Sequence, residues 1–204
     1  MSKSNIFYVR SLQLKFYGKK RNILFFLFEF ENMLFNFCKN GSDEILIQIK
    51  LKWLHDELSN EESKVEFIKN IHKSRNQKIL KPFKILIDIF SDLIQEKKII
   101  PLYKQFEKFN KKFNNILLTY EDEKLCFNSS PYFQLSLYIY IRKNSDFLSL
   151  KEFSKNYFFL DKKKIDNFEL VFIELFFKYY NLNNKKEIKK ILFLKNLLIQ
   201  SILK

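Results

Sequence analysis

Two aspartates in the middle of the chain have the spacing of a metal-binding pair. Asp88 and Asp92 lie four residues apart in a segment with helical periodicity, so both carboxylates would project from one helix face. Carboxylate oxygens are the ligands that Mg²⁺ prefers, so the functional interpretation is a pair of metal ligands. The structural interpretation places the acids beside a buried face, and the helical periodicity favours it. That face would comprise Ile85, Leu86, Ile89, Phe90 and Leu93.

The chain's cysteines and histidines predict no metal site. Cys38 and Cys126 lie far apart in sequence, and His55 and His72 are too few to build a zinc site with them. Two distant cysteines fit a reducing compartment. Each histidine is interpreted as an exposed or capping residue.

The elements that must position these residues are predicted to be helices. Two Gly and three Pro among 204 residues are too few for many strands and turns, so the fold class is all-α. No repeat or linker divides residues 1–204, which predicts a single domain. The expected helices are 5–16, 20–39, 44–58, a short helix opened by Ser59–Glu62, 82–96, 101–119, 131–143, 149–157, 162–181 and 184–203. Residues 120–130 are expected to be a polar connection.

The net charge of +14 would ordinarily indicate an anionic partner such as nucleic acid, acidic lipid or an acidic protein face. However, only four of the 37 basic residues are arginine, and Lys, Asn, Ile and Phe are abundant. This pattern is expected from AT-rich coding, which weighs against a nucleic-acid partner. Nucleic-acid binding is kept as an alternative that rests on the tracts Lys162–Lys164 and Lys185–Lys186.

The segment Arg21–Leu58, which holds the only Trp, resembles the squalene/phytoene synthase family. Phe28 to Phe30 stand for the Tyr-Ala-Phe of a helix written "ALYAFxxEL" in that family. Lys50 to Asp56 stand for the Arg-Leu-Gln-Trp-Trp-Arg-Asp of "IRLQWWRDAL". The resemblance implies a helical bundle of the terpenoid synthase type, here shortened at its C-terminal end.

Two further segments carry the same resemblance. Residues 7–14 are similar to the opening "FYLASLLL" helix, and residues 83–93 are similar to "LLDLIDGxxxDL". The second of these segments is not the family's metal motif, which weakens the interpretation of Asp88 and Asp92 as metal ligands. After about residue 125 the resemblance is weak.

The resemblance also implies two aspartate clusters that hold Mg²⁺ and diphosphate, and this chain departs from both. The positions that match the first cluster are Phe35, Asn36 and Lys39, with Glu31 as the one acid nearby. In the region of the second cluster, residues 131–146, Asp146 stands alone. A single carboxylate cannot chelate a metal–diphosphate pair as two facing carboxylates would. We therefore expect no metal and no cofactor, and we assign no catalytic residue.

The chain resembles the aspartate-poor members of the family, and this resemblance implies a relation to the assembly factors of respiratory complex I. The expected function is therefore assembly of a respiratory membrane complex, or binding of an apolar isoprenoid or lipid. The alternative is an active prenyltransferase in which Glu31, Asp88, Asp92 or Asp146 binds Mg²⁺. The family-matching surface or pocket residues are Arg21, Lys50, Lys52, Trp53, His55 and Asp56. Their structural interpretation is a solvated helix face with an anchored Trp53.

The expected location is the bacterial cytoplasm, including the inner face of the inner membrane, or the mitochondrial matrix in a eukaryote. The most apolar run, Ile23–Cys38, is shorter than a bilayer span and is interrupted by polar residues, which predicts a buried helix. The first 28 residues contain no acid, as in a mitochondrial transit peptide. However, residues 7–14 resemble the opening helix of the family, so we expect them to belong to the folded domain.

Overall fold

The computed structural model describes residues 9–14, 22–39, 43–74, 77–96, 98–120, 128–142, 165–182 and 190–203. Within these ranges the regular structure is helical and contains no strand, so the predicted all-α class is confirmed. Residues 9–14 form one helical turn and a half. The elements that follow are α2 (Asn22–Phe37), α3 (Glu44–Glu57), α4 (Glu66–Lys73), the 3₁₀ turn η1 (Gln77–Ile79), α5 (Leu80–Ile94), α6 (Ile99–Tyr120), α7 (Pro131–Arg142), α9 (Asn167–Leu182) and α10 (Lys190–Leu203).

Several helix starts follow from local side-chain chemistry. The Asp43 carboxylate accepts a hydrogen bond of 2.7 Å from the backbone N–H of Ile45 and thereby caps the N-terminus of α3. Pro82 and Pro101 lie in the first turns of α5 and α6, where a missing N–H costs no helical hydrogen bond. The Asp166 carboxylate accepts hydrogen bonds from the backbone N–H groups of Phe168 and Glu169 and so caps the N-terminus of α9.

The predicted start of the short fourth helix was wrong. Residues 59–62 form turns, and α4 begins only at Glu66. The Asn60 side chain accepts from the N–H of Glu62 at 3.0 Å, and the Ser63 hydroxyl accepts from the N–H of Val65 at 3.2 Å. These side-chain bonds stabilise turns in place of a helical first turn. The predicted helix 149–157 lies outside the described residues.

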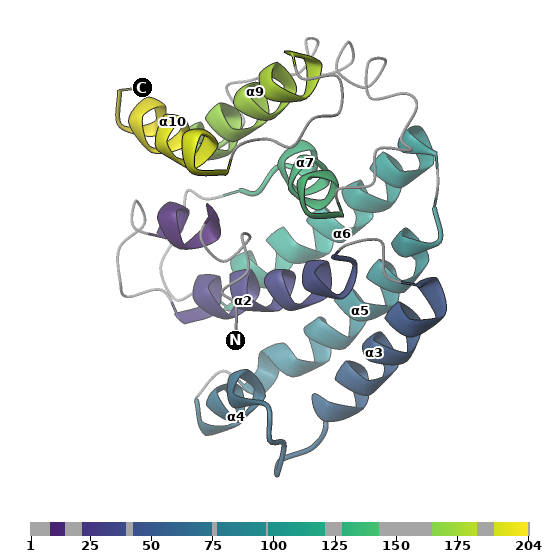
Figure 1. Cartoon of the computed structure of the whole chain (residues 1–204). Coiled ribbons are helices and arrows are strands. Elements are labelled where there is room, and N and C mark those ends of the chain that lie inside the picture. Colours follow the sequence, from purple (N-terminus) through teal and green to yellow (C-terminus); the bar gives the residue numbers. More distant parts are fainter. Residues whose placement is uncertain are drawn as a thin grey trace.

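Helix α6 packs against both α5 and α7. Figure 1 shows α9 packed against α7 at the top and α10 packed against α9, while α3, α4 and α5 form the opposite end. Helix α2 crosses the middle and contacts α3, α4, α5, α6 and α7. This arrangement places α2 at the centre of the bundle and leaves one side of α3 on the outside.

Aromatic rings fill the interior between α2, α5, α6 and α7. Phe30 stacks on Phe83 with ring centroids 4.1 Å apart. Phe35 is fully buried and lies 5.7 Å from the rings of both Phe90 and Tyr138. Burial of so many rings provides a large part of the hydrophobic stabilisation of the bundle.

Candidate functional site

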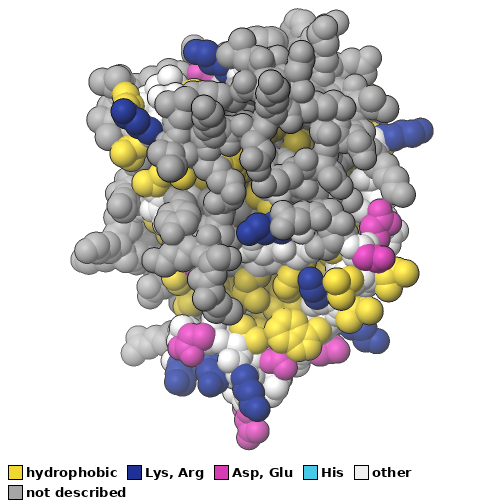
Figure 2. Space-filling view, in the orientation of Figure 1, with side chains coloured by type: hydrophobic (Ala, Val, Ile, Leu, Met, Phe, Trp, Pro, Cys, Tyr) yellow, Lys and Arg dark blue, Asp and Glu magenta, His cyan; other side chains and the backbone are white. Residues whose placement is uncertain are grey.

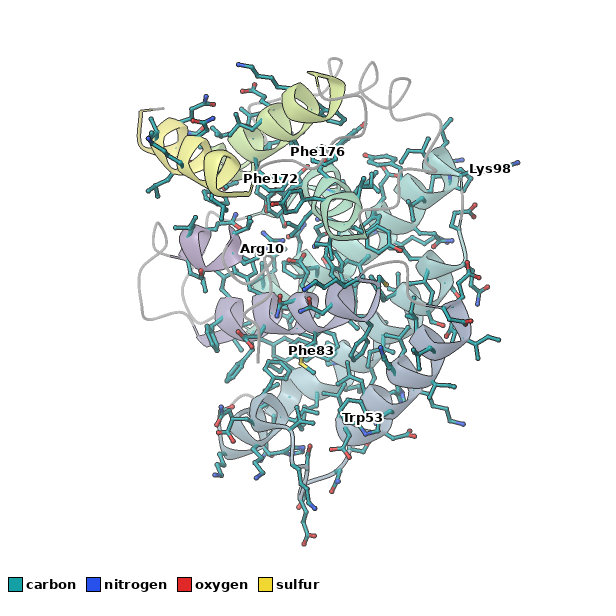
Figure 3. The ribbon with its side chains drawn as sticks, viewed as in Figure 1. Arg10, Trp53, Phe83, Lys98, Phe172 and Phe176 are labelled. Atoms are coloured by element: carbon teal, nitrogen blue, oxygen red, sulfur yellow. The ribbon has the colours of Figure 1, made fainter. Side chains whose placement is uncertain are left out.

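A buried guanidinium lies where residues 9–14, α2, α7 and α9 meet. Arg10 is 1% exposed and binds the fully buried Glu31 of α2 through two hydrogen bonds. Its Nε donates to Oε2 at 2.6 Å, and its Nη2 donates to Oε1 at 2.8 Å. This bidentate geometry is the strongest that an arginine and a carboxylate can form. Figure 3 shows Arg10 inside the bundle.

A second buried carboxylate approaches the same guanidinium from α9. Arg10 Nη1 donates to Glu169 Oε1 at 2.8 Å and to Gln13 Oε1 at 2.7 Å. Glu169 also accepts from the Ser129 hydroxyl at 2.8 Å and from the backbone N–H of Ser130 at 2.6 Å. With a further bond from Nη2 to Ser129 Oγ at 3.2 Å, the guanidinium makes five hydrogen bonds. The network joins segments that lie 21 to 159 residues apart in sequence.

Aromatic rings and amides surround this network. The guanidinium carbon of Arg10 lies 4.2 Å from the ring centroid of Phe28 and 4.4 Å from that of Phe133, so the cation has aromatic faces as neighbours. Gln134 donates to Glu31 Oε1 at 2.8 Å and accepts from Asn110 at 3.0 Å. Burial of these charges is tolerated because they are paired and hydrogen-bonded.

Burial and pairing shift the ionisation of the network. Burial alone would lower the pKa of Arg10, but the carboxylates of Glu31 and Glu169 outweigh it and raise that pKa. Burial raises the pKa of Glu169 to about 7, although Arg10 acts in the opposite direction, and Asp166 adds to the rise. Because burial outweighs the attraction of Arg10, the pKa of Glu169 lies near neutral pH and this site can hold a proton there.

The structure does not gather the carboxylates proposed from the sequence. Glu31 is buried against Arg10, whereas Asp88 and Asp92 are exposed on α5. Asp146 lies outside the described residues. In the part of the chain that the structure describes, no three His, Cys, Asp or Glu residues could hold a metal ion together. Phe35, one of the positions that match the first aspartate cluster, is buried in the aromatic core.

The other predicted site residues lie on α3, except Arg21, which is outside the described residues. Lys52, Trp53 and Asp56 are exposed, and Lys50 and His55 are half-buried. His55 Nδ1 lies 3.6 Å from Asp56 Oδ1. The polar members are spread over the helix surface, which fits the solvated face of the structural interpretation. The anchored Trp53 of that interpretation is wrong, because the Trp53 side chain is exposed.

Trp53 belongs to an exposed apolar face of α3. Ile45 is 72% exposed and Ile49 is 60% exposed, while Trp53 is 47% and Leu46 46% exposed. We call these four residues the α3 face. Ile45, Ile49 and Trp53 recur every four residues, so they form a continuous stripe on the side opposite the buried Ile47, Leu51 and Leu54. Figure 2 shows hydrophobic side chains gathered over α3, and Figure 3 shows Trp53 on its outer side.

The Arg10 network was missed by the sequence analysis, although Glu31 was named. Its members come from distant segments, so no spacing reveals them. Two signals were present: Arg10 is one of four arginines in a lysine-rich chain, and Glu169 interrupts an apolar helix. A charged residue within an apolar helical pattern indicates a buried partner.

No family model, curated protein or solved structure matches this chain. Among the described residues, every helix is too short or too polar to cross a bilayer.

Proposed function

We propose that this chain is a non-catalytic helical protein of the squalene/phytoene synthase type that acts by binding, in the assembly of a respiratory membrane complex. The observation that carries the proposal is the α3 face, Ile45, Leu46, Ile49 and Trp53, which is exposed next to a well-packed core. Contiguous exposed apolar side chains mark interaction sites more often than single exposed residues do. The terpenoid synthase type of bundle is part of the same proposal and rests on the segments that resemble the family.

Two features favour binding over prenyl transfer. Glu31, the acid nearest to the first expected metal cluster, is used in the ion pair with Arg10. Asp88 and Asp92 lie on the exposed side of α5, while the metal–diphosphate chemistry of prenyl transfer needs facing carboxylates in a closed site. The proposed site of action is therefore the outer surface of α3.

Affinity purification tests the proposed function. The tagged chain is expressed in its own cells, the membranes are dissolved in mild detergent, and co-purifying proteins are identified by mass spectrometry. We expect enrichment of respiratory-complex subunits with the native chain and its loss with Ile49→Ser. Ile100→Ser is the matched control, because Ile100 is 54% exposed on α6 and is not part of the α3 face. Absence of respiratory subunits from the native sample contradicts the proposal.

An activity assay tests the enzymatic alternative. The pure protein is incubated with farnesyl or geranylgeranyl diphosphate and Mg²⁺, and released diphosphate is measured over time. We expect release no faster than in the protein-free blank. Steady release that Asp88→Ala abolishes would replace the binding proposal with a prenyltransferase.

A further inference from the structure

The α3 face has an acidic border, although the chain as a whole carries a net charge of +14. From residue 43 to residue 57 there are two lysines and four acids, which gives 2 − 4 = −2 with His neutral. The acids lie at both ends of the helix, Asp43 and Glu44 at the start and Asp56 and Glu57 at the end, while the half-buried Lys50 and the exposed Lys52 lie between them. The charge on either end of the apolar stripe is thus opposite to that of the chain.

Helix α5 extends the acidic border along one side of α3. Gln48 of α3 and Ser91 of α5 exchange two hydrogen bonds, at 2.7 and 3.2 Å. Asp92 follows Ser91, and Asp88 precedes it by about one helical turn, and both are exposed. Lys84, the basic residue on this part of α5, contacts Ser59 beyond the end of α3. Asp88 and Asp92 are therefore exposed acids on α5 within one helical turn of Ser91, the residue that contacts the middle of α3.

We infer that the α3 face binds an amphipathic helix of a partner protein whose apolar stripe is flanked by Lys or Arg. The apolar stripe supplies the packing surface for a helix, and the acidic border supplies charge complementarity that fixes its orientation. An anionic membrane surface is disfavoured, because its headgroups would meet the carboxylates at both ends of the stripe.

This inference rests on the proposed function for the source of the helix. Loops near the cytoplasmic ends of membrane-spanning helices carry an excess of Lys and Arg. A membrane-complex subunit therefore presents segments of the required chemistry on the side where a non-spanning protein can reach them.

Trp53 gives a direct optical test, because it is the only Trp in the chain and lies in the α3 face. Two 18-residue peptides without aromatic residues are titrated into the protein, one an amphipathic Leu/Lys helix and the other its Leu/Glu twin. We expect the Leu/Lys peptide to shift Trp53 emission to shorter wavelength and to bind at least about tenfold more tightly than the twin. Attraction by the net charge of +14 alone would favour the Leu/Glu peptide. Net charge and the acidic border of the α3 face therefore predict opposite orders of affinity for the two peptides.

Variants separate the apolar stripe from its border. Ile49→Ser should weaken the Leu/Lys peptide about tenfold, because it removes an apolar contact at the centre of the stripe, while Ile100→Ser should bind like the native chain. Reversal of both Asp88 and Asp92 to Lys should weaken the peptide about three- to tenfold and reduce the effect of added salt.

Three outcomes would overturn the inference. The first is tighter binding of the Leu/Glu peptide or equal binding of both. The second is a Trp53 shift with vesicles of anionic lipid and none with the Leu/Lys peptide. The third is a Trp53 shift that depends on protein concentration without any peptide, which would identify a second copy of this chain as the occupant. If the peptide order holds while affinity purification finds no respiratory subunits, only the proposed function fails.

Discussion

The Arg10 network and the α3 face both reverse the usual placement of side chains. In the first, one cation and two carboxylates are buried among aromatic rings, with Glu31 and Glu169 fully buried. In the second, large apolar side chains are exposed on a helix whose opposite side forms part of the core. Each reversal costs free energy unless something compensates for it.

The two regions differ in where the compensation lies. In the Arg10 network it is internal, because the guanidinium makes five hydrogen bonds to residues of the same chain. For the α3 face, we propose that the compensation comes from a partner protein that covers the exposed apolar side chains. A buried charge with its partners inside the fold thus indicates a structural role, while an exposed apolar stripe indicates binding.

The largest expected effect comes from Arg10→Met. The substitution leaves the carboxylates of Glu31 and Glu169 buried without a counter-charge, so we expect the free energy of unfolding to fall by about 3–5 kcal/mol. Urea denaturation followed by circular dichroism measures it. Lys104→Met, on the exposed side of α6, is the control and should change stability by less than about 0.5 kcal/mol. A loss below about 1 kcal/mol for Arg10→Met would mean that the network adds little to stability.

A matched pair on α3 tests the other half of the comparison. Ile47 is 1% exposed and Ile49 is 60% exposed, although both are isoleucines of the same helix. Ile47→Ala should cost about 2–4 kcal/mol through lost burial and a cavity. Ile49→Ala should leave the isolated chain within about 0.5 kcal/mol of native stability. Thermal and urea denaturation of both variants check this.

The outcome of that pair decides whether the α3 face is free in the isolated chain. Equal and large losses for Ile47→Ala and Ile49→Ala would mean that Ile49 is covered in solution, and the binding proposal would lose its surface. A loss confined to Ile47→Ala would leave the face available to a partner.

The fold class and most helices could be predicted because they depend on local signals. The predicted helices 44–58 and 101–119 correspond to α3 and α6, because Asp43 caps the first and Pro101 lies in the first turn of the second. The start of α4 could not be predicted, because turn bonds of Asn60 and Ser63 compete with a helical start of similar composition.

The candidate site was less predictable than the fold. Periodicity on α5 separated Asp88 and Asp92 from the buried Leu86, Phe90 and Leu93. It was wrong about Ile85, which is 37% exposed, and it left out the buried Ile87. It could not pair Arg10 with Glu169, because their contact depends on how α9 packs against the start of the chain, 159 residues away. The exposure of Trp53 also depends on which side of α3 the bundle covers, and apolar residues occur on both sides.

The smallest expected effect is a pH dependence that belongs to the buried region alone. Burial raises the pKa of Glu169 from its usual value of about 4.5 to about 7, so between these values the folded chain holds a proton that the unfolded chain has released. Its contribution to stability is complete below the lower pKa and is lost as pH rises through the higher one, which amounts to a decrease of about 2–3 kcal/mol between pH 5 and pH 8. Glu29, whose pKa burial also raises, acts in the same direction, so the measured quantity is the difference between the native chain and Glu169→Gln. Urea denaturation at pH 5 and pH 8 should show a smaller decrease in the free energy of unfolding for Glu169→Gln. Equal decreases in both proteins would mean that Glu169 stays ionised beside Arg10 across this range, and the network would then be a permanent ion pair with no proton to release.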